Sequence, residues 1–291
     1  CENVAMGRNA MRCNTTGDSN IGIGAYSLGA NTTADNNTAV GKSALSTNTT
    51  GCQNVAVGTS ALQSNTDAFK NVAVGFEAGK DNTTADNLTA IGFQAAQNNT
   101  TGGGNTGVGS AALNTNTTGS SNTAMGSGAL YANTTASNNT AIGAGALDTN
   151  TTGSQNTAVG KDALTANTTA VGNTAVGTQS LDANTTGFNN TAVGNCSGSG
   201  VTTGDCNTYI GAFAAYTAST GNNNTAVGDQ ALSLMTTASE NTAVGRSALK
   251  ANTTGASNVA VGKNAGEANT TGSNNIAIGD SALISNTTNT T

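Results

Sequence analysis

The chain has 291 residues, of which 8% are charged and 3% are aromatic, with no histidine, tryptophan or proline. The formal net charge of -6 offers no basic surface to nucleic acid, and no apolar stretch reaches the roughly 18 residues that would span a membrane. Without histidine, and with only scattered carboxylates, the composition predicts no enzyme, no metal centre and no cofactor site.

A glycine recurs at every seventeenth position along the chain, from Gly7 and Gly24 to Gly279. The 17 repeats contain no insertion or deletion, and a disordered low-complexity chain has no reason to keep such a period. We number each repeat from the asparagine of the NTAVG motif, so that the glycine is position 5. This period predicts a single repeat domain over residues 1–291.

The first expected strand covers residues 4–6, and its equivalents follow once in each repeat, at 21–23, 38–40 and onwards to 276–278. These are positions 2 to 4 of each repeat. Side chains alternate between the two faces of a strand. We predict that position 2, which is Thr in most repeats, and position 4, which is aliphatic or Met, face inward and that the alanine of position 3 faces outward. The glycine of position 5 then allows a bend that a Cβ atom would obstruct.

Positions 7 to 9 predict a second short strand, and the NTTG segment that follows is typical of a turn. Two short strands and two turns in each repeat describe one coil of an all-β, parallel β-solenoid, or β-roll, with 17 stacked coils that are each one repeat long. A helical interpretation fails because Gly, Asn and Thr are poor helix formers. Position 1 is asparagine in every repeat except the one with Leu88, which predicts a ladder of side-chain amides between coils.

The motif NTAVGxxAL followed by NTTG resembles the repeats of bacteriophage tail-fibre proteins and, more distantly, the head repeats of YadA-type trimeric adhesins. Residues 274–279, NNIAIG, are similar to the strand and bend of those heads, whose usual repeat is shorter. The resemblance covers essentially the whole chain. It implies a parallel β-roll that assembles as a trimer on a virion or a cell surface.

Five cysteines suggest disulfide bonds. Cys196 and Cys206 lie in one repeat that lacks both the alanine of position 8 and the leucine of position 9. We predict that they form a bridge worth about 2–3 kcal/mol in place of the missing apolar contacts. Cys1 and Cys13 are candidates for a second pair, which leaves Cys52 unpaired. Such bonds would indicate an oxidising, extracellular location.

Acceptor motifs for N-glycosylation, Asn-x-Thr, occur in one phase in 13 of the 17 repeats. They begin at position 12, and the alternative is that Asn and Thr serve only as turn and ladder residues. The candidate acceptors are Asn14, Asn31, Asn48, Asn82, Asn99, Asn116, Asn133, Asn150, Asn167, Asn184, Asn252, Asn269 and Asn286. Further Asn-x-Thr motifs begin at Asn36, Asn87, Asn138, Asn189 and Asn223.

The sequence predicts a structural shaft of an extracellular fibre, phage tail fibre or surface adhesin. The outward alanine column and the absence of capping segments predict self-association, as a homotrimer or a head-to-tail fibre. The alternative is an adhesin module that binds a receptor or host-surface glycan, for which exposed aromatics in residues 207–216 are the main candidate. Ice binding is a further alternative, but it needs two threonines on one face of a strand, and the paired threonines here are adjacent.

Overall fold

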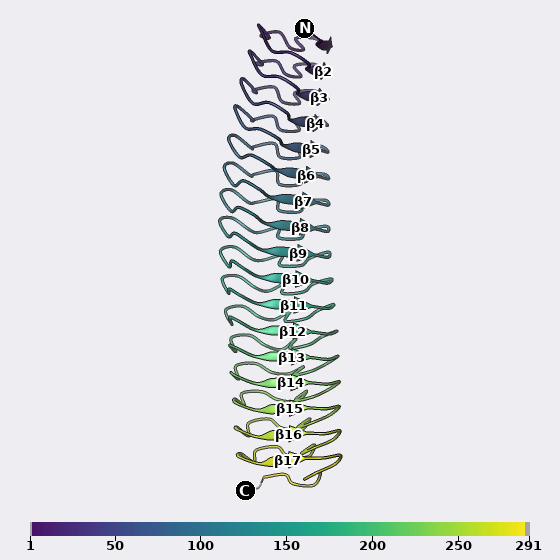
Figure 1. Ribbon diagram of the computed structural model, residues 1–291, viewed down its shortest axis with the longest axis vertical. Helices are drawn as coiled ribbons and strands as arrows, with labels where there is room; N and C mark the ends of the chain where they lie inside the picture. Colours follow the sequence, from purple (N-terminus) through teal and green to yellow (C-terminus); the bar gives the residue numbers. More distant parts are fainter. Residues whose placement is uncertain (1, 289–291) are drawn as a thin grey trace. The chain divides into compact units, whose positions relative to one another are not determined.

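The computed structural model describes residues 2–288, which form 17 three-residue β-strands and no helix. The chain divides into two compact units, Cys1–Ala144 (unit 1) and Gly145–Thr291 (unit 2). In each unit the strands lie one above another with one turn of chain between consecutive strands (Figure 1). The predicted all-β parallel solenoid is confirmed.

Unit 1 contains β1 (Val4–Met6), β2 (Ile21–Ile23), β3 (Thr38–Val40), β4 (Val55–Val57), β5 (Val72–Val74), β6 (Thr89–Ile91), β7 (Thr106–Val108), β8 (Thr123–Met125) and β9 (Thr140–Ile142). Unit 2 contains β10 (Thr157–Val159), β11 (Thr174–Val176), β12 (Thr191–Val193), β13 (Thr208–Ile210), β14 (Thr225–Val227), β15 (Thr242–Val244), β16 (Val259–Val261) and β17 (Ile276–Ile278).

The strands pair in parallel with a constant offset of one repeat. Between β3 and β4, for example, Thr38 lies beside Val55, Ala39 beside Ala56 and Val40 beside Val57. The same offset holds between successive strands within unit 2, as between β10 and β11. Each residue therefore stacks on its own equivalent, and the predicted coil length of one repeat is confirmed.

The glycine of position 5 is required both by its backbone conformation and by its neighbours. Gly41 has φ of +134°, a value that side-chain-bearing residues rarely adopt. A Cβ atom built on Gly41 would lie 2.5 Å from the carbonyl oxygen of Gly58 in the next coil. Successive coils therefore approach each other too closely at this column to admit a side chain.

The core of each coil is narrow and contains mostly small side chains. Position 3 faces inward: Ala39 is fully buried, as are Ala44 of position 8 and Leu45 of position 9 in the same coil. The leucine is the largest side chain of the usual coil, and its burial contributes about 1.5–3 kcal/mol. The prediction that position 3 faces outward is wrong. A coil this short has no interior space for two β-branched residues per strand, so the strand directs its smallest side chain inward.

The second strand predicted at positions 7 to 9 does not form in residues 2–288. Ser43 and Leu45, at positions 7 and 9, have φ of 59° and 49°, in the left-handed region rather than the extended one. Their amides still bond to adjacent coils: Ser43 N donates to Ala25 O at 2.9 Å, and Leu45 N donates to Ala61 O at 3.1 Å. The backbone groups of this turn are thus satisfied by stacking even though no strand is present.

The position-1 asparagines form the predicted ladder. Asn54 N donates to Asn37 Oδ1 of the preceding coil at 2.9 Å, and Asn37 Nδ2 donates to the carbonyl of Gly51 at 2.9 Å. Each amide therefore connects two coils and also bonds to the turn at position 15. Both asparagines are fully buried, so these bonds replace the hydrogen bonds to water that they lose on folding.

Replacement of Gly41 by alanine tests the glycine column. We expect Gly41→Ala to lower the free energy of unfolding by more than about 2 kcal/mol, because the new methyl group would overlap with Gly58 and the residue would keep a positive φ. Gly103→Ala is the matched control, since its Cβ would meet only Asp86 O at 3.4 Å. Denaturant unfolding followed by circular dichroism measures both, and an equal loss in the two variants would contradict the role of the column.

Candidate functional site

The described residues, 2–288, enclose no pocket and contain no group of three or more His, Cys, Asp or Glu side chains that could hold a metal ion. A functional site in this part of the chain must therefore lie on the surface. Two kinds of surface are candidates: a uniform one, repeated in every coil, and local ones where a coil departs from the pattern.

The uniform surface consists of the side chains at positions 2 and 4 of the strands, which we call the strand face. Position 2 is Thr, Val or Ile, and position 4 is Val, Ile or Met, so no charge occurs at either position in any of the 17 repeats. These side chains are half-buried or exposed, as in Ile91 (39% exposed) and Ile210 (40% exposed). The prediction that positions 2 and 4 face inward is wrong, because it assigned the two faces of the strand the wrong way round.

The position-12 asparagines are interior residues. Of the 13 candidate glycosylation sites, all but Asn14 and Asn286 are buried. Asn48 is typical: its Nδ2 donates to Asn31 Oδ1 at 3.1 Å and to Gly51 O at 2.9 Å. A glycan would replace one of these two hydrogens on the same nitrogen. The folded coil is therefore incompatible with glycosylation at the buried sites, and the alternative interpretation of these residues as a ladder accounts for them.

The acceptor motifs at position 17 have a different environment. They begin at exposed asparagines whose φ values lie near 60°, in the turn before each strand. Nothing buries these side chains in the coil, so a sugar attached there would point into solvent. The five residues are Asn36, Asn87, Asn138, Asn189 and Asn223.

The predicted bridge between Cys196 and Cys206 is absent: both are free cysteines, as are Cys13 and Cys52. Cys1, the proposed partner of Cys13, lies outside the described residues. Cys196 and Cys206 occupy positions 7 and 17, at two separate left-handed turns of the coil, with φ of 51° and 58°. Burial, and next the charge of Asp182, raise the pKa of the Cys196 thiol, which makes it a poor nucleophile.

The missing leucine of this coil is replaced by a side chain from the next one. Gly198 stands at position 9, and a Cβ atom on it would lie 2.8 Å from Cδ2 of Tyr209. Tyr209 is the one large residue at position 3 and is fully buried. Ser197 Oγ donates to the Tyr209 carbonyl at 2.9 Å. The tyrosine ring thus fills the space for which the sequence predicted a disulfide bond.

The aspartates of position 16 have a structural role. Asp35 Oδ1 accepts from the backbone N–H of Asp18 in the preceding coil at 2.7 Å. Asp18 accepts in the same way from Glu2 N at 2.6 Å and also from Ser19 N at 2.8 Å. These bonds, that of Glu2 first, lower the pKa of the Asp18 carboxyl. Each carboxylate therefore satisfies a turn amide rather than forming part of a charged site.

Local departures involve exposed aromatic rings. In residues 207–216, Phe213 and Tyr216 lie edge to face with centroids 5.6 Å apart. A second pair, in unit 1, was missed by the sequence reasoning: Phe76 and Phe93 stack with centroids 5.5 Å apart and an interplanar angle of 11°. The signal was available, because both residues occupy position 6 of adjacent repeats and so must lie one above the other.

No protein-family model matches the chain, and no curated protein matches it. Within residues 2–288 there is no helix long and apolar enough to cross a bilayer. The resemblance to tail-fibre and adhesin-head repeats therefore stays a prediction from the motif.

A double mutant tests whether the Tyr209 ring fills the space that the leucine of position 9 would occupy at Gly198. Tyr209→Ala should cost about 3–5 kcal/mol through the cavity it leaves, and Gly198→Leu should be destabilising because its side chain meets the tyrosine ring. The double variant restores the alanine and leucine of the usual coil, so it should be more stable than either single variant. Thermal unfolding of the three variants measures this; additive losses would contradict the exchange.

Expression in a host that secretes and N-glycosylates the protein distinguishes the acceptor motifs that begin at position 12 from those that begin at position 17. In the folded fraction we expect sugars only at position 17, for example at Asn36 and Asn138, because the amides of Asn48 and Asn99 are enclosed in the ladder. Mass spectrometry after enzymatic deglycosylation in heavy-oxygen water marks each occupied site. Occupancy of Asn48 or Asn99 in folded protein would show that the ladder is not formed there.

Proposed function

We propose that this protein is a structural solenoid that associates laterally with further copies of itself through the strand face, as the shaft of a fibre. The resemblance to tail-fibre and adhesin-head repeats supports an extracellular fibre on a virion or cell surface. The cysteines give this location no support, since the four described ones are free thiols. The proposed activity is mechanical and involves no catalysis.

The open strand face is the observation on which the proposal depends. Parallel sheets are almost always covered on both faces. Here position 3 packs against the core, while positions 2 and 4 remain half-buried or exposed throughout both units, as at Val74 and Val261. Position 4 is apolar in every repeat, and monomeric proteins rarely leave a contiguous apolar surface in water. The strand face therefore has the composition of an interface.

A second copy of the chain fits this face better than an unrelated partner. The face carries no charge, so two copies meet without burying an unpaired ion. Both copies also have the same spacing between coils, about 4.8 Å, so contacts made in one coil recur in the next. A twofold or threefold arrangement would cover the face.

Two matched double variants test the proposed interface. Val176→Glu with Val193→Glu adds two carboxylates to the strand face, and Thr178→Glu with Asn195→Glu adds two in the same coils at exposed position 6. We expect only the first variant to dissociate the assembly, because it would bury charge at the interface. Light scattering gives the mass, and circular dichroism checks that both variants fold.

A stable wild-type monomer of 28.1 kDa, or equal assembly of both variants, would contradict the proposal. A monomer that produces thermal hysteresis and faceted ice crystals would instead favour ice binding. One observation supports that alternative: each strand from β8 to β15 directs a threonine outward, although only one threonine stands on each strand. The Val176 and Val193 variant would then lose the hysteresis.

A further inference from the structure

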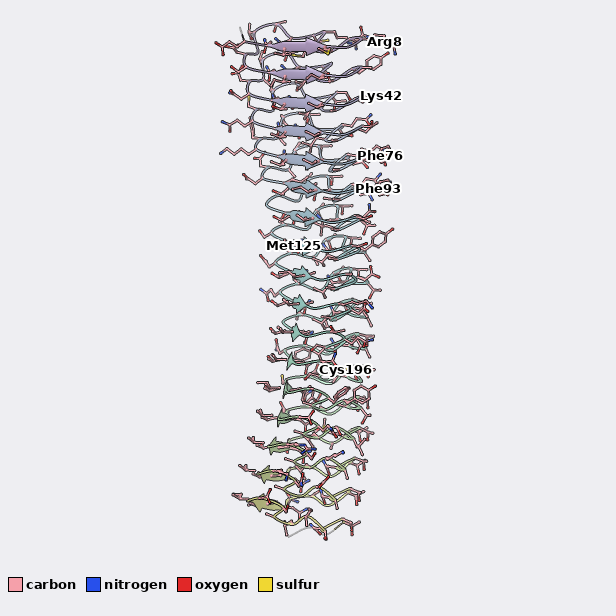
Figure 2. The ribbon with its side chains drawn as sticks, turned by 90° about the vertical axis from the view of Figure 1, so that its right-hand side faces the viewer. Arg8, Lys42, Phe76, Phe93, Met125 and Cys196 are labelled. Carbon is pink, nitrogen blue, oxygen red and sulfur yellow. The ribbon has the colours of Figure 1, made fainter. Side chains whose placement is uncertain are left out.

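Phe76 and Phe93 stack on each other at one edge of unit 1, so each ring covers one face of the other, and the outer face of each ring is the apolar surface of the pair. The two rings are nearly parallel, and their side chains are 46% and 53% exposed. Figure 2 shows both projecting from the same edge of the coils as Arg8 and Lys42, which also occupy position 6. In the coils on either side, position 6 is Thr59 and Ser110, whose short side chains cannot extend over a phenyl ring.

Hydrogen-bonding side chains follow each phenylalanine directly. Glu77 Oε2 accepts from Gln94 Nε2 at 3.0 Å and from Gln97 Nε2 at 2.8 Å. Lys80 Nζ lies 3.3 Å from Glu77 Oε1. These contacts hold a carboxylate and two amides together at positions 7 and 10 of the two coils that carry the rings. The bond from Gln94, and next that from Lys80, lower the pKa of Glu77, so its carboxylate stays ionised as an acceptor.

We propose that Phe76, Phe93, Glu77, Gln94 and Gln97 form a binding surface for a neutral polysaccharide of hexopyranose units. The C–H face of a pyranose ring with equatorial hydroxyls is flat and apolar, and it stacks on exposed aromatic rings. The hydroxyls at its rim donate to carboxylate and amide oxygens and accept from amide N–H groups. The five side chains offer both functions within two neighbouring coils.

The form and charge of the surface favour an extended, uncharged polymer as the ligand. Residues 2–288 enclose no pocket, so the ligand lies along the surface, as an extended polymer does, rather than inside a cavity. The net charge of -6 and the ionised Glu77 disfavour anionic saccharides. The pair Phe213 and Tyr216 meets at an interplanar angle of 74° and therefore lacks two parallel outer ring faces.

The experiment uses the full chain and three probes: insoluble cellulose, soluble cellohexaose and the anionic polymer alginate. We expect retention on cellulose and binding of cellohexaose by calorimetry, with no retention on alginate. Phe76→Ala with Phe93→Ala should weaken binding by at least about tenfold, as truncation of central aromatic residues does at other interfaces. Glu77→Gln should weaken it less. Phe213→Ala is the matched control, being an exposed aromatic outside the surface, and should bind as wild type.

Absence of wild-type binding to both neutral probes would overturn the proposal. Equal binding by the double phenylalanine variant, or retention on alginate alone, would do the same. The strand-face variant Val176→Glu with Val193→Glu separates this site from the proposed assembly. It lies in unit 2, so it should still bind cellohexaose, whereas the phenylalanine variant should still assemble.

Discussion

Stacking of every residue on its own equivalent, one repeat further along the chain, is the constraint on which this structure depends. A buried polar group in such a stack meets a copy of itself, so it must be able both to donate and to accept. Asparagine satisfies this condition, and two asparagine columns therefore line the core. In one coil Asn37 and Asn48 both donate to the Gly51 carbonyl. Where Val201 interrupts the column of position 12, Asn184 Oδ1 is left without a partner.

The same constraint explains how a chain with only 35% hydrophobic residues folds. The coil is too narrow for large side chains, so alanine and one leucine fill it. Hydrogen bonds of the backbone and of the asparagine columns then hold successive coils together. The coil also keeps non-glycine residues such as Leu45 at positive φ. That conformation is unfavourable for leucine, and burial of its side chain offsets the cost.

Departures from the repeat fall into two groups with different consequences. Core exceptions compensate one another: Gly79 lacks the usual leucine, and Cδ2 atoms of Leu62 and Leu88 occupy the space beside it. Such changes conserve volume and leave the surface unaltered. Surface exceptions such as Phe76 need no compensation and change only what the coil presents to solvent. A regular core can thus support both the uniform strand face and local surface features such as the pair Phe76 and Phe93.

The sequence alone determined the all-β class, the length of the coil, the glycine column and the ladder of position 1, because each follows from a strict period and from residue types with few alternative roles. The tertiary structure decided which strand face is inside. Alternation shows that Thr38 and Val40 share a face, but only the small interior of the coil shows that Ala39 must be the inward one. It also decided that Asn48 is enclosed while Asn36 is exposed, although both begin acceptor motifs. Motif chemistry is local, whereas burial depends on the coils above and below. For the same reason the pair Cys196 and Cys206 suggested a bond that the ring of Tyr209, from the following coil, makes unnecessary.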